Sequence, residues 1–298
     1  MPRKLIFFYN PISGTKSKQA LLDLIQTKTS AEGLAFEILE TNAAGDYTYL
    51  HKKIAEEKVT DIIVCGGDGT VNQVAAALLN VDINIGIIPM GSGNGLALAA
   101  GIPKNAGKAL DIIFKGKASF IDGFYLNQHF SCMLCGLGFD AQVAHDFAKQ
   151  SRRGLATYVK QTFSNFFSAK AYPFILDIDN KRIKTEAFFI SIANSNQFGN
   201  NVTIAPQASI CDGLIDIVVV KKMSKVRLLF SLLKQIKMGQ VTPSEKKYHK
   251  EDILYYQSKS FTLQNPLEAP LHIDGDPAGT AKNFDIKIIE KAFRLLQP

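Results

Sequence analysis

Long apolar runs are missing from this chain of 298 residues. No charge-free apolar segment reaches the roughly 18 residues that a membrane-spanning helix requires. The short apolar stretch near the N-terminus lacks a small-residue cleavage site after it, so we do not expect a signal peptide. The length and the 46% content of hydrophobic residues suit one large or two medium globular domains. The sequence therefore predicts a protein that is soluble or peripheral to a membrane.

Cysteine is also scarce, with four residues at Cys65, Cys132, Cys135 and Cys211. Most of them lie in apolar, strand-like segments, which favours reduced thiols in a cytoplasm. Cys132 and Cys135 have the spacing of half a zinc site or a redox pair, but no second such pair and no spaced histidine pair follows. A buried strand is the favoured interpretation of that segment.

Excess positive charge is confined to the second part of the chain. Residues 1–122 carry 12 Lys and Arg against 12 Asp and Glu, whereas residues 123–298 carry 22 against 15. Residues 221–250 alone hold nine basic residues against one acidic residue, Glu245. Such a block favours contact with an acidic surface, either anionic lipid or nucleic acid, and a solvated basic face is the alternative.

Strand-like and helix-like segments alternate along residues 1–122. The strands are expected at 4–10, 35–41, 61–67 and 83–92. Four helices follow them, at 20–28, in a segment that ends near residue 58, at 71–79 and at 94–101. This repeated pattern predicts a mostly parallel sheet covered by helices. Three of the post-strand turns carry glycine and small polar residues, at 10–14, 66–70 and 91–95. Ligands gather at the carboxyl ends of such strands, so we expect the three turns to converge.

After Asp122 the sequence changes to strands joined by short turns, with two helical patterns at about Leu155–Ala169 and Lys225–Met238. This predicts an antiparallel, β-sandwich-like second domain. The expected fold is therefore an α/β domain with a mostly parallel sheet at 1–122, followed by a β-rich domain at 123–287. Whether the last residues, about 288–298, return to the first domain is left open.

The stretch from Gly66 to Thr70, Gly-Gly-Asp-Gly-Thr, joins a strand to a helix with almost no turn between them. Glycine lets backbone N–H groups approach a ligand, and the positive end of the helix dipole lies at the same point, so the stretch predicts a phosphate site. Asp68 would repel phosphate unless a cation intervened, so we assign it to Mg²⁺ or to a hydroxyl group. The alternative is a turn that needs glycine only for its backbone angles. The Walker and dinucleotide glycine signatures both fail here.

Seven ordered motifs carry a family resemblance. They are Asn10-Pro11-x-Ser13-Gly14, Thr41 followed by Gly45-Asp46, Gly66-Gly67-Asp68-Gly69-Thr70-x-Asn72, Pro89-x-Gly91-Ser92-x-Asn94, Gly136-x-Gly138-Phe139-Asp140-Ala141, Asp212-Gly213-Leu214 and Asp274-Gly275-Asp276. In this order they resemble the diacylglycerol kinase catalytic family of soluble lipid kinases, which includes sphingosine and ceramide kinases. The resemblance covers nearly the whole chain.

The resemblance implies transfer of the γ-phosphate of ATP to a lipid hydroxyl, with the nucleotide in the first domain and the lipid in the second. The ATP site would be lined by Asn10, Pro11, Ser13, Gly14, Thr41, Gly66, Gly67, Asp68, Gly69, Thr70, Asn72 and Ser92. A structural Mg²⁺ would bind Asp212 and the carbonyl oxygens near Ser209 and Leu214. The family's proton acceptor corresponds to Asp276, where most members have the longer Glu.

Phosphoryl transfer depends on positioning, on charge neutralisation and on one group that accepts the proton of the attacking hydroxyl. Asp274 and Asp276 lie two residues apart at a strand end, so we expect their side chains to point to the same side. One would be the base and the other a metal or hydrogen-bond partner. A solvated Asp-Gly turn is the alternative.

The substrate is less well defined. The Gly91-Ser92-Gly93-Asn94 motif is similar to that of sphingosine and ceramide kinases, so diacylglycerol and a sphingoid-type lipid both stay open. Asp140 and the pair Arg152 and Arg153 lie where sphingosine kinases contact the lipid head group and a phosphate, and an exposed helix start explains them equally well.

A basic amphipathic pattern covers Lys225–Met238, with Val226, Leu229 and Leu233 on the apolar side. It would hold a cytoplasmic lipid kinase at an anionic membrane surface, without a role for nucleic acid. The alternative is that the apolar side packs into the protein core.

Two other functions stay open. An NAD kinase shares the Gly-Gly-Asp-Gly-Thr stretch and the two-domain plan, but the opening at Asn10 and the ending at Asp276 match the lipid kinases, and a soluble dinucleotide gives the basic helix no role. A catalytically silent lipid-binding module is disfavoured because Asp68 and Asp276 are both present. The sequence also leaves open whether the chain forms a homodimer.

Overall fold

The computed structural model describes residues 2–11, 18–42, 45–150, 162, 164, 165, 169–199, 202–224 and 252–298. The chain divides into two compact units, one of Met1–Ile121 with Lys291–Pro298 and one of Asp122–Glu290. Several sequence predictions fall outside the described residues, namely those on Ser13, Gly14, Arg152, Arg153, the helix at Lys225–Met238 and most of the helix at Leu155–Ala169. Within the described ranges no helix is long and apolar enough to cross a membrane.

A parallel sheet forms the centre of the first unit. Its strand order is β4, β3, β1, β2, and the bounds are β1 Lys4–Tyr9, β2 Ala35–Glu40, β3 Asp61–Gly66 and β4 Asn84–Pro89. The end of β17 (Asn283–Gln297) pairs in parallel with β4 through Arg294 and Leu295. Every residue of β3 is buried, which explains why this strand appears in the sequence as a nearly continuous apolar run.

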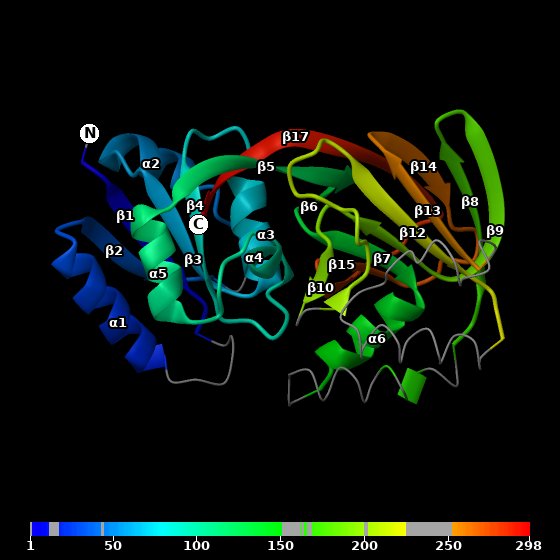
Figure 1. Cartoon of the computed structure of the whole chain (residues 1–298), viewed down its shortest axis with the longest axis horizontal. Coiled ribbons are helices and arrows are strands. Elements are labelled where there is room, and N and C mark those ends of the chain that lie inside the picture. The colour runs from blue at the N-terminus through cyan, green and yellow to red at the C-terminus, as the bar shows by residue number, and fades with distance from the viewer. Residues whose placement is uncertain are drawn as a thin grey trace. The chain divides into compact units, whose positions relative to one another are not determined.

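Helices alternate with these strands along the chain. Their bounds are α1 Lys18–Ala31, α2 Leu50–Glu57, α3 Asp68–Ala77, α4 Gly95–Ala99 and α5 Ala106–Lys115. At the start of α5 the Asn105 side chain accepts a hydrogen bond from the Lys108 N–H, which makes Asn105 an N-cap. Figure 1 shows α1 and α5 side by side, and the Lys28 ammonium of α1 meets the Asp111 carboxylate of α5 at 2.6 Å.

The second unit is built from antiparallel strands. Their bounds are β5 Lys117–Leu126, β6 His129–Ser131, β7 Leu134–Gly138, β8 Tyr172–Ile178, β9 Lys181–Ala193, β10 Gln197–Gly199, β11 Val202–Thr203, β12 Ile215–Lys221, β13 Ile253–Ser258, β14 Ser260–Gln264, β15 Leu271–Ile273 and β16 Asp276–Ala278. The main sheet follows the order β16, β15, β7, β9, β8, β14, β17, and β12 pairs with β9 and β13. Phe124, Phe174 and Ile190 lie in its buried core. The predicted fold class, an α/β unit followed by an antiparallel β-rich unit, is confirmed.

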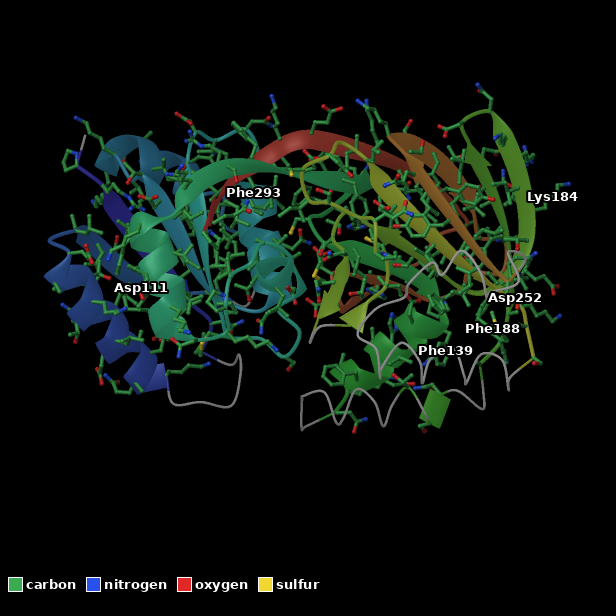
Figure 2. The ribbon with its side chains drawn as sticks, in the orientation of Figure 1. Asp111, Phe139, Lys184, Phe188, Asp252 and Phe293 are labelled. Atoms are coloured by element: carbon green, nitrogen blue, oxygen red, sulfur yellow. The ribbon has the colours of Figure 1, made fainter. Side chains whose placement is uncertain are left out.

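The sequence pattern did not predict α6 (Phe139–Ala148), which follows β7 directly. Its first residue, Phe139, continues the apolar run of β7 and fell within the predicted strand segment. Gly138, with φ 95°, ends β7 and allows the change of direction. In Figure 1 α6 lies beside β7 and β15, and Figure 2 labels the buried Phe139 of α6 and the buried Phe188 of β9. The helix α5 was likewise absent from the sequence prediction.

Candidate active site

Two glycine turns come together at the carboxyl ends of β3 and β4. The Met90 N–H donates a hydrogen bond to the Gly66 carbonyl oxygen at 2.8 Å. A Cβ atom on Gly91 would lie 2.6 Å from the Cα atom of Gly67. A Cβ atom on Gly67 would lie 3.1 Å from the Cα atom of Gly91. The two turns therefore meet through backbone atoms, in a contact that glycine alone makes without displacement.

The helix α3 begins at Asp68, three residues earlier than its predicted start at Val71. Asp68 and Gly69 thus belong to the first turn of the helix, and Gly67 is its N-cap. Because glycine has no side chain, no side-chain cap occupies the N-terminus of α3. The first N–H groups of a helix lack partners within the helix and carry partial positive charge, so this N-terminus is suited to an anion.

The turn that contains Ser92 is closed by an asparagine side chain. Asn94 has φ 56°, and its Oδ1 atom accepts a hydrogen bond from the Gly91 N–H at 2.8 Å while its Nδ2 atom donates to the Gly91 carbonyl oxygen at 2.7 Å. The Leu96 N–H donates to Asp68 Oδ1 at 3.3 Å. These contacts fix the half-buried Ser92 close to the first turn of α3.

The first predicted motif reaches the same place from β1. The Asn10 side chain donates a hydrogen bond from Nδ2 to Thr70 Oγ1 at 3.1 Å, and the Asn10 N–H donates to the Cys65 carbonyl oxygen at 3.1 Å. A Cβ atom on Gly66 would lie 2.9 Å from the Thr70 Cβ atom, so glycine there allows the threonine to approach. The structure therefore brings Asn10, Gly66 and Thr70 together.

Thr41 also lies at this edge of the sheet, because its N–H donates a hydrogen bond to the Tyr9 carbonyl oxygen at 3.0 Å. The Asn42 side chain accepts a hydrogen bond from the Asp46 N–H at 3.1 Å and so shapes the turn after it. Gly45, with φ 68°, places this turn against α3, since a Cβ atom there would lie 3.0 Å from the Gln73 side chain.

Lys18, the first residue of α1, is a candidate site residue that the sequence pattern did not single out. Partial burial lowers the pKa of its ammonium group, and the Cys65 thiol acts in the opposite direction. Cys65 is the next to last residue of β3, so a cation stands near the carboxyl end of that strand. The signal available in the sequence was the pair Lys16 and Lys18 after the first glycine turn.

The two acidic residues of the Asp-Gly-Asp turn differ in environment. Asp274 is buried with φ 48°, Gly275 has φ 86°, and Asp276 is exposed at the start of β16. Our expectation that the two carboxylates point to the same side assumed the alternation of a strand, and the positive φ values of Asp274 and Gly275 show that this alternation is absent here. The Asp274 carboxylate accepts hydrogen bonds from the Leu134 N–H at 2.9 Å and from the Ser131 hydroxyl at 2.6 Å.

Asp140 lies in the first turn of α6 and is buried, which differs from an exposed helix start. Its Oδ1 atom accepts a hydrogen bond from the Ala141 N–H at 2.8 Å, and its Oδ2 atom lies 3.5 Å from His272 Nε2. Burial raises the pKa of Asp140, and the interaction with His272 opposes that rise. His272 was not singled out by the sequence pattern, since a lone histidine in a short strand carries no local signal.

The predicted Mg²⁺ ligands lie in the loop before β12. The Leu214 N–H donates a hydrogen bond to Asp212 Oδ1 at 3.1 Å, and the Gly213 N–H donates to the buried Asp122 carboxylate at 2.8 Å. Partial burial of the Asp212 carboxyl group raises its pKa, and the nearby Asp122 charge adds to the effect. Two carboxylates therefore share one turn, which is an environment that a cation would stabilise.

Side chains would supply only some of the ligands of a bound Mg²⁺. No group of three or more His, Cys, Asp or Glu residues in the described part of the chain is arranged to hold a metal ion. The Asp212 carboxylate with the carbonyl oxygens of Ser209 and Leu214 would instead supply hard oxygen ligands, and Mg²⁺ commonly completes such a set with water. The residues present are compatible with this ion.

All four cysteines are free thiols. Cys132 and Cys135 are both buried, as predicted, and Cys135 belongs to β7, whereas Cys132 lies in the bend between β6 and β7 rather than in a strand. Cys65 is buried in β3, whereas Cys211 is exposed next to Asp212. None of the four forms a disulfide bond.

Comparisons with known proteins agree with these motifs. Residues 4–125 match the diacylglycerol kinase catalytic domain, and residues 134–296 match the YegS C-terminal NAD kinase beta sandwich-like domain. A diacylglycerol kinase of Bacillus subtilis (strain 168) is 26% identical to this chain over 276 residues, which cover 91% of this chain and 89% of that protein. A crystal structure of a diacylglycerol kinase from Bacillus anthracis str. Sterne has the same fold, with a TM-score of 0.76, 21% identity and coverage of 99% of this chain and 97% of that one. The chain therefore belongs to the diacylglycerol kinase catalytic family of lipid kinases.

Proposed function

We propose that this protein transfers the γ-phosphate of ATP to the hydroxyl group of a lipid, either diacylglycerol or a sphingoid-type lipid. The proposal rests above all on the backbone contact of Gly67 with Gly91 beside the uncapped N-terminus of α3. Such an arrangement lets phosphate oxygens approach backbone N–H groups, and it gives bound phosphate a favourable helix dipole. Lys18 would add a positive charge near the same strand ends.

The remaining nucleotide ligands in this proposal are those of the family motifs. Asn10 and Thr70 are joined by a hydrogen bond, and Ser92 and Thr41 lie on the adjoining turns. These groups would orient the nucleotide rather than react with it. The full ATP-binding set is Asn10, Pro11, Ser13, Gly14, Thr41, Gly66, Gly67, Asp68, Gly69, Thr70, Asn72 and Ser92.

Asp276 is the general base in this proposal. It accepts the proton of the lipid hydroxyl while the hydroxyl oxygen forms a bond to the γ-phosphorus and the bond from phosphorus to the leaving oxygen of ADP breaks. Its exposure supports the assignment. Asp274 is disfavoured, because both of its carboxylate oxygens accept hydrogen bonds from the segment between β6 and β7.

Mg²⁺ would bind Asp212 with the carbonyl oxygens of Ser209 and Leu214, and Asp68 is a second carboxylate for a cation or a substrate hydroxyl. When bound, Mg²⁺ would supply positive charge that the acidic turn at Asp212 requires. The Gly213 N–H already orients Asp122 toward this turn.

The lipid substrate requires the protein to work at a membrane surface. We propose peripheral binding of a cytoplasmic protein to anionic lipid through the basic residues of 221–250, with no role for nucleic acid. The apolar positions of Lys225–Met238 would enter the interface while the basic positions contact lipid head groups.

A substrate panel tests the function. The purified full chain would be incubated with Mg-ATP and, separately, diacylglycerol, monoacylglycerol, ceramide, sphingosine and NAD, and the products would be identified by mass. A phosphorylated lipid supports the proposal, and its identity defines the substrate. Phosphorylation of NAD without any lipid product would favour an NAD kinase, and lipid binding without any product would favour a silent lipid-binding module.

A further inference from the structure

His272 lies in β15 two residues before the Asp-Gly-Asp turn, and its side chain is fully buried. The Gly275 N–H donates a hydrogen bond to His272 Nδ1 at 3.3 Å. A ring nitrogen that accepts a hydrogen bond carries no proton, so the proton of the neutral imidazole must lie on Nε2. The backbone of the turn thus specifies one tautomer of His272.

Asp140 supplies the group that this tautomer requires. Its Oδ2 atom lies 3.5 Å from His272 Nε2, which is a close electrostatic contact but longer than an ordinary hydrogen bond, and its Oδ1 atom accepts a hydrogen bond from the Ala141 N–H at 2.8 Å. The carboxylate is therefore turned so that Oδ2 faces the ring. The negative carboxylate stabilises a proton on Nε2. In the other tautomer Nε2 would present a lone pair to the carboxylate, which is unfavourable.

The absence of a side chain at Gly136 of β7 leaves space for the Asp140 carboxylate and the His272 ring. Gly136 pairs with His272 in the antiparallel register of β7 and β15. A Cβ atom on Gly136 would lie 2.1 Å from Asp140 Oδ2 and 2.5 Å from His272 Nε2. Any larger residue would push the carboxylate and the imidazole apart, so glycine here is required by the pair rather than by the backbone conformation.

A second histidine joins the same helix to the same strand without touching the turn. His145 Nε2 lies 2.7 Å from the Leu271 carbonyl oxygen, so α6 contacts β15 at Asp140 and again at His145, more than one helical turn later. The contact at His145 holds the helix against the strand. Only the contact at Asp140 continues, through the imidazole, to the Gly275 N–H.

We infer that His272 is a positioning residue for Asp276. The Asp140 carboxylate favours the tautomer with the proton on Nε2, and Nδ1 accepts the hydrogen bond from Gly275, the residue directly before Asp276. The inference rests on the proposed role of Asp276 as general base. Asp274 and Gly275 both have positive φ, as in the two-residue turn of a β-hairpin, and the hydrogen bond to His272 holds the peptide between these two residues. Asp274 anchors one side of the turn through its side chain, and His272 anchors the peptide on the other side.

A pair of substitutions at His272 separates its hydrogen bond with Gly275 from its electrostatic contact with Asp140. In His272→Asn the amide oxygen can take the place of Nδ1 and accept from Gly275, whereas in His272→Gln the amide nitrogen can take the place of Nε2 and donate to Asp140. We expect His272→Gln to lower kcat by about 10- to 100-fold, the range expected for a small displacement of a catalytic group. His272→Asn should retain most of the activity, and neither variant should change the KM for ATP.

Nitrogen NMR of the imidazole rings tests the tautomer without any measurement of activity. The chain has five histidines, so the signals of His272 can be assigned by their loss in His272→Asn. The wild-type ring should carry its proton on Nε2. In Asp140→Asn the amide oxygen keeps the Ala141 N–H and the amide NH₂ group faces the ring, so the proton should move to Nδ1 and the Gly275 amide signal should shift.

His145→Gln is the matched control, because it removes a contact between α6 and β15 but leaves the turn alone. It should lower the stability of the protein but should change neither the tautomer of His272 nor the kcat. A wild-type ring protonated on Nδ1, or equal kcat values for His272→Asn and His272→Gln, would overturn the inference. An active Asp276→Asn variant would instead overturn the proposed base, and the tautomer result would still stand.

Discussion

The Asp274 carboxylate accepts a hydrogen bond from the Ser131 hydroxyl at 2.6 Å, although the two residues are 143 positions apart in the sequence. The same Oδ1 atom accepts from the Met133 and Leu134 N–H groups at 3.2 and 2.9 Å, and Oδ2 accepts from the Cys132 N–H at 3.3 Å. One buried carboxylate therefore satisfies the backbone of the bend between β6 and β7. This relationship separates the structural acid of the turn from the exposed Asp276.

Substitution of the two acids should therefore affect different properties, stability for Asp274 and turnover for Asp276. Asp274→Ala leaves buried N–H groups without an acceptor and should lower the free energy of unfolding by about 2–4 kcal/mol, as measured by urea denaturation. Asp276→Asn should change stability by less than about 0.5 kcal/mol and should lower kcat by about 10²- to 10⁴-fold. ATP binding should persist in Asp276→Asn. Full turnover by that variant, with the chemical step limiting the rate, would move the base to Asp68 or Asp274.

The contact of the two glycine turns should control nucleotide binding. In Gly91→Ala the new Cβ atom would meet the Gly67 Cα atom at 2.6 Å, so the turns must separate. Overpacking of this kind costs about 1–3 kcal/mol, and ~1.4 kcal/mol is a tenfold change in affinity. We expect ATP affinity, measured by calorimetry, to fall about tenfold or more, and we expect a greater loss for Gly67→Val. Gly279→Ala is the control, because nothing lies within 4 Å of a Cβ atom there. Unchanged affinity in a folded Gly91→Ala variant would leave the glycines a role in the turn alone.

Cys211 should be the thiol that reacts in the folded protein. It is exposed, whereas Cys65, Cys132 and Cys135 are buried, and burial raises the pKa of Cys65 and Cys135 and so removes their reactive thiolate. A thiol reagent should titrate one cysteine in the native wild type and all four in the wild type unfolded in urea. It should titrate none in native Cys211→Ser. Rapid reaction of a second native thiol would contradict the burial of these strands.

Some parts of the structure follow directly from the sequence, and the reasons are local. The strand β3 is predicted because both of its faces are buried, which leaves a nearly continuous apolar run. The meeting of the turns at Gly67 and Gly91 follows from the parallel order of β3 and β4, since the carboxyl ends of neighbouring parallel strands lie at one edge.

Other parts depend on distant residues and had no local signal. The Asp-Gly-Asp turn has the composition of an exposed turn, and Asp274 becomes buried only because Ser131–Leu134 supplies its hydrogen bonds. Similarly, α6 begins with the apolar Phe139 directly after β7, so the end of the strand is set by the φ of 95° at Gly138 rather than by a break in the apolar run at that residue.

The basic segment of the second unit should control membrane binding, a prediction that rests on the sequence alone. Replacement of Lys225, Arg227, Lys234 and Lys237 by Gln should weaken binding to anionic vesicles, because each cation near such a surface contributes about 1 kcal/mol. The salt dependence of binding should become flatter. Vesicle sedimentation at two salt concentrations measures both effects.

A control with the same change in net charge uses exposed lysines elsewhere in the chain, Lys52, Lys108, Lys181 and Lys184. Figure 2 shows the Lys184 side chain directed away from the ribbon. This control should bind vesicles almost as the wild type does. Equal binding by the wild type and both variants would assign the apolar side of Lys225–Met238 to the core.

Mg²⁺ should stabilise the protein through the turn at Asp212 even without ATP. Asp122 and Asp212 place two carboxylates around Gly213, and a bound cation would relieve their repulsion while it takes carbonyl oxygens as further ligands. At about ten times its Kd, a ligand that binds only the folded state adds about 1.4 kcal/mol, which raises Tm by a few degrees. Asp212→Asn should remove this rise in Tm, whereas Cys211→Ser, at the exposed neighbouring residue, should keep it. A rise that persists in Asp212→Asn and disappears in Asp68→Asn would place the cation at the start of α3 instead.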